Sequence, residues 1–588
     1  MNKIKDVISI HYGHDATVVY IKNGEIVEAM SEERLSRQKK HIGFPHLSLE
    51  YIKNKYSLSK IEKAYLVGNS NSESSNIFYT LEDNIKIRKG QVKYRDYKMS
   101  LILTLPGLSN VLDVYHFLKR KIFEFKTGFL VSSYIKKVLP GTEIIRLHHH
   151  SAHAWSSVAF IKNKHKKYLV FTLDGAGDNL SGTINIFENN KMTRLNSFSY
   201  RQSLGLVYSS IVDILGMSRN EHEFKVMGLA PYAKISQGEA VYAELQKIIW
   251  FDKKSMEIKS LIPTTKTTPY LITKNFHRYR FDALAYGVQK LTEEIIKSMV
   301  LAYVGKYNIK NIALGGGVFM NVKANQTLLE QKEVEDVVIT PSSGDESLAI
   351  GSAIYGFINE GNSIDDFKTP SSLYLGSEYT EKEIGDALAS YKFKNDIEIK
   401  IFNDPGEIEK VVAKLLSENK VVGRFKGRSE WGARALGNRS ILANPSSRDN
   451  VKLINEMIKG RDFWMPFATS ILYEDREKYL IDTKNFFAPY MSITFRTKPL
   501  AEKDLIAALH PYDLTSRPQM VTKDMNQSYH NLIMEYKNIT GSSGILNTSF
   551  NLHGEPNVET PNDAIRTFDL SGLNYLAIGN HLVSKKNA

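Results

Sequence analysis

The chain has 588 residues, too many for one compact core, so we expect two or more domains. Hydrophobic residues make up 42% and charged residues 24% of the chain, which is ordinary for a folded protein and argues against long disordered regions. The sequence contains no cysteine, which excludes disulfides, thiolate nucleophiles and Cys-based metal sites, so a metal ion could be held only by His, Asp and Glu.

The net charge of +13 does not by itself indicate a nucleic-acid partner. The lysines are spread over segments such as IKNKHKK, and no basic and aromatic pattern of an RNA-binding module accompanies them. We therefore expect a solvated, lysine-rich surface, no nucleic-acid partner, and an advantage for anionic small-molecule substrates.

The first residues predict a run of strands. DVISIHYGHDATVVYIKNGEIVEAMS contains β-rich segments separated by the turn YGHD and by the hairpin signal KNGE. The pattern returns in KYLVFTLDGAGDNLSGTINIFENN, where an apolar strand again ends in an acidic turn. We expect an internal duplication of a β-hairpin that carries an acidic turn.

No apolar segment has the length of a membrane span. The run VISI near the start is too short for a signal peptide, and the stretch 99–125 is broken by Pro106 and Gly107. We expect a cytoplasmic protein without stable membrane insertion. For 99–125, helices packed on a core are the favoured interpretation, and a membrane-surface or partner-binding segment is the alternative.

The stretch IIRLHHHSAHAWSS places four histidines in six positions. On a helix, His149 and His153 lie on one face about 6 Å apart along the axis, so two imidazoles could bind one ion. Taken alone, such a pair is more often structural than a metal site.

Two glycine turns follow strands in NIALGGGVFMN and VVITPSSGDES, and each turn leads into a predicted helix. Glycine turns of this kind present backbone N–H groups to phosphates. A tight turn from a strand into a helix also favours glycine, so packing is the alternative explanation.

Near residue 370 the polar segment EGNSIDDFKTPSSLYLGS predicts a linker, and helical patterns follow at 380–392 and 404–420. VVGRFKGRSEWGARALGNRS then places five cations among four glycines. Guanidinium groups bind phosphate or carboxylate through paired hydrogen bonds, and glycines let the backbone approach a ligand closely. This segment therefore predicts an anion-binding site.

A series of motifs between about residues 10 and 575 carries a resemblance to a known family. In chain order they are GHDATVVYIKNGEIVEAMSEERLSRQKK, HHSAHA, TLDGAGD, SLGLVYSSIVDILG, EFKVMGLAPYA, GGGVFMNVKAN, PSSGDESLAIGSA, GRFKGRSEWGARALGNRSILANP and LNTSFNLHGEPNVETPNDAIRTF. They resemble the ATP-dependent O-carbamoyltransferases of the nodulation-factor, cephamycin and tobramycin type.

The resemblance implies an α/β protein of two domains. Residues 1–365 are expected to form a duplicated actin/Hsp70-like (ASKHA) domain, and residues 366–588 a YrdC-like domain that makes carbamoyl-adenylate from carbamoyl phosphate and ATP. The N-terminal domain is then expected to transfer the carbamoyl group to a hydroxyl of a small-molecule acceptor, such as a sugar, natural product or glycolipid. Mg²⁺ with ATP and a homodimer also follow from the resemblance.

The resemblance also implies the site residues. The metal ligands, around Fe²⁺ or another divalent ion, are His149, His153, Asp174 and Asp345. The N-terminal nucleotide or intermediate site contains Lys225, Gly315, Gly316, Gly317, Asn321 and Gly344. The C-terminal site for carbamoyl phosphate and ATP contains Arg424, Lys426, Arg428, Arg434, Asn438, Arg439, Lys459, Arg461, Asn547, Ser549, Asn551 and His553. The expected catalytic groups are Lys225, Arg439 and His14, the last as general base or acceptor ligand, with a structural role as its alternative.

Two segments depart from the family pattern. Ala433 stands where the family has proline, and Met465 where it commonly has arginine. Loss of that guanidinium predicts weaker phosphate binding unless a neighbour such as Arg461 compensates for it. The stretch 70–137 is expected to shape the acceptor pocket, although a buried helical pair explains it equally well.

Two rival functions stay open at this point. One is a tRNA threonylcarbamoylation-type enzyme, and the other is a non-catalytic nucleotide-sensing module of the actin-like class.

Overall fold

A computed structural model describes residues 6–58, 61–68, 128–263, 268–404, 406–481 and 483–586. The chain divides into a first unit, Met1–Glu32 with Lys40–Pro370, and a second unit, Glu33–Lys39 with Ser371–Ala588. The stretch 70–137 was expected to shape the acceptor pocket, and its residues 70–127 lie outside the described residues. Among the helices described, none is both long and apolar enough to cross a membrane.

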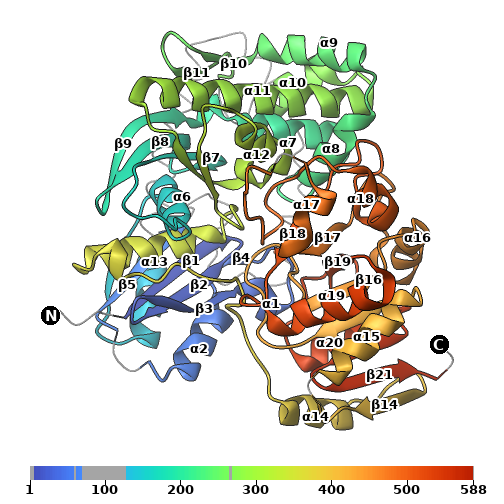
Figure 1. The fold of residues 1–588 in the computed structure, drawn as a ribbon. Helices are drawn as coiled ribbons and strands as arrows, with labels where there is room; N and C mark the ends of the chain where they lie inside the picture. The colour runs from blue at the N-terminus through green and yellow to red at the C-terminus, as the bar shows by residue number, and fades with distance from the viewer. Residues whose placement is uncertain are drawn as a thin grey trace. The chain divides into compact units, whose positions relative to one another are not determined.

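The first unit contains two sheets with the same topology (Figure 1). The order is β3-β2-β1-β5-β6 in one sheet and β9-β8-β7-β12-β13 in the other. In both, three antiparallel strands are followed by two that run parallel to the first. The first sheet consists of β1 (Val7–His14), β2 (Thr17–Lys22), β3 (Glu25–Ser31), β5 (Lys63–Gly68) and β6 (Glu143–Arg146), with β4 (Ile42–Gly43) paired to β1. The second consists of β7 (Tyr168–Gly177), β8 (Leu180–Glu188), β9 (Lys191–Ser199), β12 (Asn311–Gly315) and β13 (Asp336–Ile339). The expected duplication is confirmed, and it extends over five strands of each sheet.

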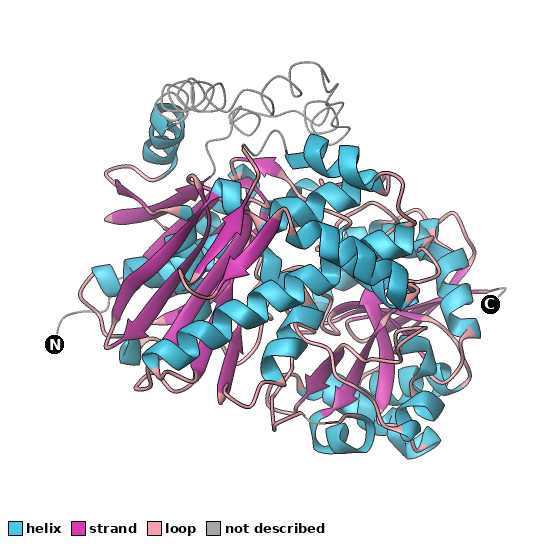
Figure 2. Ribbon diagram, turned by 90° about the horizontal axis from the view of Figure 1, so that it is seen from above, coloured by secondary structure: helices cyan, strands magenta, loops and turns pink. Residues whose placement is uncertain are grey.

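The remaining elements of this unit are mostly helices, and Figure 2 shows helices and strands together throughout, as in a mixed α/β fold. They are α1 (Glu32–Ser36), which continues into the second unit, α2 (His46–Lys55), α6 (His149–Val158), α7 (Leu204–Ile214), α8 (Glu223–Leu229), α9 (Ile235–Gln246), α10 (Thr268–Phe276), α11 (Phe281–Tyr307), α12 (Val322–Leu329), α13 (Ser347–Asn359), and the ribbon of β10 (Ile249–Asp252) and β11 (Glu257–Ser260).

Two of these helices form the centre of the first unit. Helix α13 packs on β1, β2 and β5, helix α6 packs on β7, β8 and β12, and the two helices pack on each other. Their approach is close, because a Cβ atom placed on Gly351 of α13 would lie 1.8 Å from the carbonyl oxygen of Ala152 in α6. Helix α6, which carries the histidine cluster, is therefore held firmly between neighbouring elements.

Gly351→Ala is expected to lower the free energy of unfolding by about 2–3 kcal/mol, because its methyl group has no room between α13 and α6. Gly385 is the matched control, since a Cβ atom at this helical position of the second unit meets no atom within 4 Å. Gly385→Ala should stabilise by roughly 0.5–1 kcal/mol. Calorimetry would test both, and an unchanged transition for Gly351→Ala would contradict the close packing.

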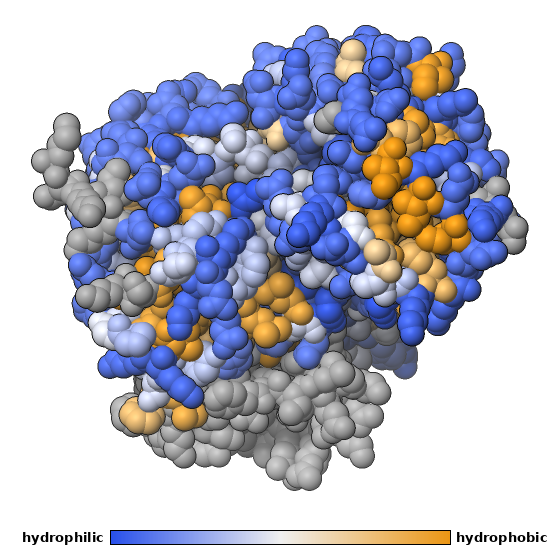
Figure 3. Space-filling model, turned by 90° about the horizontal axis from the view of Figure 1, so that it is seen from below, coloured by the Kyte–Doolittle hydropathy of each residue, from blue (hydrophilic) through white to orange (hydrophobic). Residues whose placement is uncertain are grey.

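The second unit is built on one sheet of eight strands in the order β14-β21-β20-β15-β16-β19-β17-β18. Helices α14 and α20 pack against one hydrophobic core, which includes Phe425 and Leu576, and α15 and α19 against another, which includes Val422 and Ala577. The strands are β14 (Ile397–Ile401), β15 (Val422–Phe425), β16 (Arg439–Ala443), β17 (Ala468–Leu472), β18 (Pro518–Val521), β19 (Gly544–Ser549), β20 (Tyr575–Ile578) and β21 (His581–Lys585). The helices are α14 (Glu381–Ser390), α15 (Glu407–Ser417), α16 (Asp449–Ile454), α17 (Arg476–Tyr479), α18 (Pro499–Asp504), α19 (Gln527–Thr540) and α20 (Pro561–Leu570). Figure 3, which looks at the lower side of Figure 1, shows apolar side chains in several patches among a largely hydrophilic surface.

The sequence predicted a linker near residue 370, and the chain passes from the first unit to the second between Pro370 and Ser371, within that segment. Leu373 and Leu375 are buried, and the Ser377 hydroxyl donates to the buried carboxylate of Glu559. The polar composition of this segment reflects hydrogen bonds to the core of the second unit.

Residues 33–39 are a short N-terminal segment that belongs to the second unit. Arg34 donates to the carbonyl oxygen of Gly432, and Arg37 donates to those of Pro556 and Asn557. No pattern in the sequence predicted these contacts, because they join residues about 400 to 520 positions apart.

Candidate functional site

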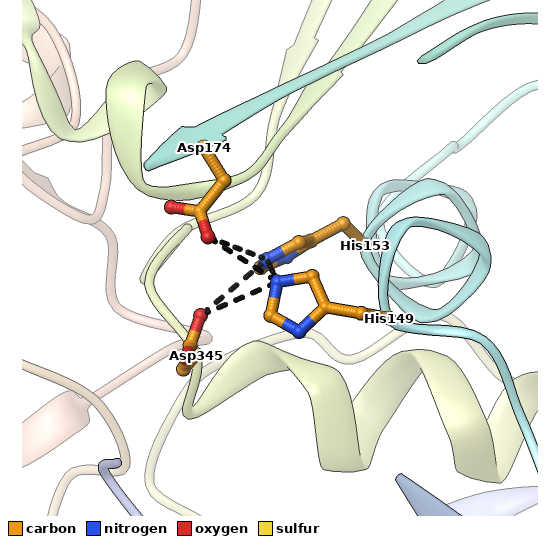
Figure 4. A group of neighbouring side chains, drawn as sticks. All are labelled: His149, His153, Asp174 and Asp345. Carbon is orange, nitrogen blue, oxygen red and sulfur yellow. Dashed lines mark hydrogen bonds and ion pairs between the residues drawn. The ribbon is translucent and has the colours of Figure 1, made fainter. Parts of the chain in front are cut away.

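Four side chains converge in the first unit, as Figure 4 shows. They are His149, His153, Asp174 and Asp345, and one potential ligand atom of each lies within 4.8 Å of the others. The two Nε2 atoms are 3.1 Å apart. His149 Nε2 is 3.2 Å from Asp174 Oδ2, and His153 Nε2 is 3.6 Å from Asp345 Oδ1. The structure thus brings together all four residues that the sequence suggested as ligands.

The positions of these groups follow from the ends of strands and helices. His149 begins helix α6, and its backbone N–H donates to Asp178 at 2.8 Å, which caps the helix. Asp174 lies near the end of β7 and accepts the Gly317 N–H at 3.2 Å. Asp345 lies in the turn between β13 and α13. His149 and His153 therefore lie on one face of helix α6, as the sequence predicted, and both carboxylates are held close to that face.

The electrostatics of the cluster favour a cation. Burial alone would lower the pKa of His149, but the charges of Asp345 and Asp174 outweigh it and raise that pKa to about 9. Burial would raise the pKa of Asp174, but the neighbouring histidines hold it below its ordinary value. The two carboxylates thus retain a positive charge on His149, and a divalent cation could take the place of that proton. Imidazole and carboxylate donors suit a borderline ion such as Fe²⁺ or Zn²⁺.

The two other histidines of the stretch do not join the cluster. His150 is fully buried and its Nδ1 lies 3.0 Å from Thr172 Oγ1, and burial lowers its pKa well below the ordinary value. The side chain of His148 is 37% exposed, and its Nδ1 lies 3.9 Å from Asp178 Oδ2.

His14 ends strand β1 and pairs with its neighbour. Its Nδ1 lies 2.6 Å from Asp15 Oδ2, while Asp15 has a φ of 58°, in the left-handed region that non-glycine residues seldom adopt. Burial would lower the pKa of His14, but the Asp15 carboxylate raises it above its ordinary value. With Nδ1 held by Asp15, Nε2 is the nitrogen left for another proton.

The glycine turn of the first unit has a packing explanation. A Cβ atom on Gly315 would lie 2.5 Å from the His153 carbonyl oxygen, and one on Gly317 would lie 2.7 Å from Asp174 Oδ1. Gly316 has a φ of 97°. Close approach to the cluster therefore accounts for Gly315 and Gly317, and the left-handed backbone accounts for Gly316.

The other residues expected at a nucleotide lie on separate elements. The Asn321 side chain caps α12 and exchanges hydrogen bonds with Gln289. Lys225 lies on α8, and Gly344 precedes Asp345.

Two of the arginines in the second unit are tied to protein groups. Arg439 has no exposed surface, donates to the carbonyl oxygens of Lys426, Asn438 and Ser377, and stacks 3.7 Å from the centre of the Phe425 ring. Arg424 donates to the Gly437 carbonyl oxygen and to the side chains of Asn438 and Ser528.

Two further cations of the same segment also contact protein groups. Lys426 pairs with Glu409 at 3.0 Å, and Arg428 donates to the Gly376 carbonyl oxygen at 3.1 Å.

Arg439→Ala is therefore expected to lower the free energy of unfolding by roughly 3–5 kcal/mol, because three carbonyl groups would lose a buried donor. Arg448→Ala, at an exposed position, should change it by less than about 0.5 kcal/mol. Urea denaturation checks both variants. If Arg439→Ala were as stable as the parent protein, the buried contacts would have no stabilising role, and its effect on activity would then report ligand binding.

The Lys459 ammonium group in the second unit donates hydrogen bonds to neutral oxygen atoms and to no carboxylate. Its Nζ donates to the carbonyl oxygen and hydroxyl of Ser549 and to the side chain of Asn551, and its carbonyl oxygen lies 2.8 Å from His553 Nδ1. Burial lowers the pKa of Lys459 well below its ordinary value, and Arg461 lowers it further. Asn547, also buried, donates to Ser470, Gln519 and the Ala435 carbonyl oxygen.

Three arginines form a like-charged cluster that includes a residue the sequence analysis missed. Burial lowers the pKa of Arg517 well below its ordinary value, and the charges of Arg434 and Arg461 lower it further. Burial together with Arg434 lowers the pKa of Arg461 to about 10. Arg461 donates to Thr548 Oγ1 and stacks on Phe467. Half-buried like charges of this kind favour an anionic ligand. Arg517 was missed because it stands before the apolar strand β18, outside the glycine-rich segment.

The departure at position 465 places an apolar side chain in this unit. Met465 is buried, with 8% of its surface exposed.

Two family models cover most of the chain. The model described as carbamoyltransferase N-terminus matches residues 6–354, and the one described as carbamoyltransferase C-terminus matches residues 413–585.

The chain also resembles whole proteins. It is 30% identical to protein MJ1051 of Methanocaldococcus jannaschii, over 98% of this chain and 99% of that protein. It is 29% identical to the nodulation protein NolNO of Sinorhizobium fredii, over 98% of this chain and 79% of that protein. Among solved structures, full-length HypF in its phosphate- and nucleotide-bound form covers 62% of this chain and 57% of HypF with 12% identity and a TM-score of 0.32, a likeness too low to support an argument.

Proposed function

Since the chain belongs to the carbamoyltransferase family, and is a carbamoyltransferase, we propose that it works as an ATP-dependent O-carbamoyltransferase whose two units carry successive half-reactions. The repeated sheet topology supports an actin/Hsp70-like fold for the first unit, and we assign a YrdC-like role to the second. The acceptor is a small molecule with a hydroxyl group, such as a sugar, natural product or glycolipid.

The second unit is proposed to make carbamoyl-adenylate. It takes carbamoyl phosphate, ATP with Mg²⁺, and water, and releases phosphate and pyrophosphate. The cluster of Arg434, Arg461 and Arg517 would bind the phosphate oxygens. A phosphate bound nearby would favour the protonated form of Lys459, whose pKa burial lowers. Arg439 and Arg424 would act by holding the surrounding backbone, since their guanidinium groups donate to protein acceptors.

The first unit is proposed to transfer the carbamoyl group. His149, His153, Asp174 and Asp345 would hold a divalent cation, which when bound supplies Lewis-acid polarisation and orientation of anionic oxygens. The acceptor hydroxyl attacks the carbamoyl carbon, and the bond from that carbon to the phosphate oxygen of AMP breaks. His14 would take the hydroxyl proton at Nε2, while Asp15 keeps the ring oriented through Nδ1.

The observation that carries this proposal is the convergence of two buried imidazoles and two half-buried carboxylates, because it unites residues from three distant motifs at one point. A tRNA-modifying enzyme and a nucleotide-sensing module are the rivals.

The test measures pyrophosphate release by the full-length protein from ATP, Mg²⁺ and carbamoyl phosphate, first without acceptor and then with a panel of sugars, glycolipids and tRNA. Release that requires carbamoyl phosphate, followed by carbamoylation of a small hydroxyl compound, supports the proposal. If no pyrophosphate appears with any metal, or if only tRNA is modified, the proposal fails.

A further inference from the structure

Strand β14 leaves one edge of the eight-stranded sheet open. It pairs with β21 along one side, and no described strand pairs with its other side. Ile401 is 65% exposed and Ile399 is 38% exposed. An open edge with exposed isoleucines is an aggregation hazard unless another strand covers it.

The sequence of β14, Ile-Glu-Ile-Lys-Ile, is self-complementary. Alternate residues of a strand point to opposite faces, so Ile397, Ile399 and Ile401 share one face and Glu398 and Lys400 the other. The two charged side chains are 55% and 64% exposed. If a second β14 strand is laid antiparallel to the first with the two Ile399 residues opposite each other, Glu398 lies opposite Lys400. Every isoleucine then lies opposite another isoleucine.

We propose that β14 pairs in antiparallel fashion with β14 of a second copy of this chain, about a two-fold axis at Ile399. In this register Ile399 faces its own copy, each Ile397 faces Ile401, and each Glu398 faces Lys400 of the other copy. The two sheets then continue into one another, and the open edge disappears. This inference does not depend on the proposed function.

The charges select this register and this partner. A shift by two residues in one direction sets Glu398 against its own copy, and a shift in the other direction sets Lys400 against its own copy. Like charges directly opposite each other on paired strands are destabilising, whereas opposite charges stabilise. An edge strand that only prevents pairing would carry charges of one sign, because these would repel the same strand of a second molecule.

The dimer is expected to be weak. Five paired residues bury much less than the about 1,600 Å² of a standard interface. We therefore expect a dimer dissociation constant in the micromolar range or above. The dimer should be sought in concentrated protein at low ionic strength, where charge pairs are least screened.

The experiment is analytical ultracentrifugation of the full-length protein over a range of concentrations. Lys400→Glu turns two attractive pairs into two repulsive ones and should weaken the dimer roughly tenfold or more. Glu398→Lys should do the same. The double variant Glu398→Lys with Lys400→Glu restores opposite charges in the same register and should restore dimerisation to near the parent level, which also shows that loss in the single variants is not misfolding.

Hydrogen exchange of the parent protein provides the second measurement. Backbone amides of residues 397–401 should exchange more slowly at high than at low protein concentration. A parent protein that stays monomeric throughout, or a dimer whose strength ignores both single reversals, would overturn the proposal. So would a double variant that stays monomeric although its unfolding transition matches that of the parent.

Discussion

His153→Ala is expected to abolish carbamoyl transfer to the acceptor and to leave pyrophosphate release intact. The side chain is fully buried, and its Nε2 lies 3.1 Å from His149 Nε2 and 3.6 Å from Asp345 Oδ1. Its removal takes one of four donors from the proposed metal centre. Because a bound metal ion contributes several kcal/mol of transition-state stabilisation, transfer should fall by roughly a thousandfold or more.

The readouts of this experiment separate metal binding from activity. Metal content of the purified protein, measured by mass spectrometry, should drop in His153→Ala and in the nearly isosteric Asp345→Asn. His148→Ala is the matched control, because this neighbouring histidine is part-exposed and lies outside the cluster. Equal metal content and equal transfer in His153→Ala and the parent protein would rule out the metal centre proposed for the first unit.

Arg517→Met is expected to act in opposite directions on stability and on activity. Arg517 is half-buried beside the charges of Arg434 and Arg461, so without an anionic ligand its own charge is unfavourable. Replacing it with an apolar side chain of similar length should raise the free energy of unfolding of the ligand-free protein, by on the order of 1 kcal/mol. Pyrophosphate release should fall by at least about a hundredfold, since an electrostatic contact to the reacting phosphates is lost.

Thermal unfolding with and without carbamoyl phosphate tests the same substitution. Carbamoyl phosphate should raise the Tm of the parent protein and leave that of Arg517→Met nearly unchanged. Arg448→Met, at an exposed position, controls for the loss of one positive charge. An Arg517→Met variant that is less stable, yet binds carbamoyl phosphate as the parent does, would show that Arg517 has a structural role.

The sequence predicted the family through short motifs, and it predicted the pair of histidines on one helical face through their spacing. Both rest on local information. A helix of 3.6 residues per turn places His149 and His153 together whatever surrounds them, and the repeated strand and acidic-turn pattern indicated the duplication that the two sheets share.

The arginines show the limit of such inference. In the sequence, Arg439 lies among glycines and has the pattern of a ligand, whereas Arg517 is one cation before an apolar strand. The fold surrounds Arg439 with carbonyl oxygens and the Phe425 ring, and it leaves Arg517 beside two other guanidinium groups. Residue type and spacing do not reveal that the two arginines have different surroundings. Contacts between distant segments decide which side chains are buried and which charged groups lie beside them.

The sequence by itself thus determined the family, the pattern of strands and helices, and the residue types available for metal and phosphate binding. Only the tertiary structure decided that four ligand atoms meet within 4.8 Å, that residues 33–39 belong to the second unit, and that an edge strand with a self-complementary sequence stays open. The physical reason is the same in each case. Local patterns follow from the geometry of a helix or strand, whereas convergence, burial and open edges depend on how segments hundreds of residues apart pack together.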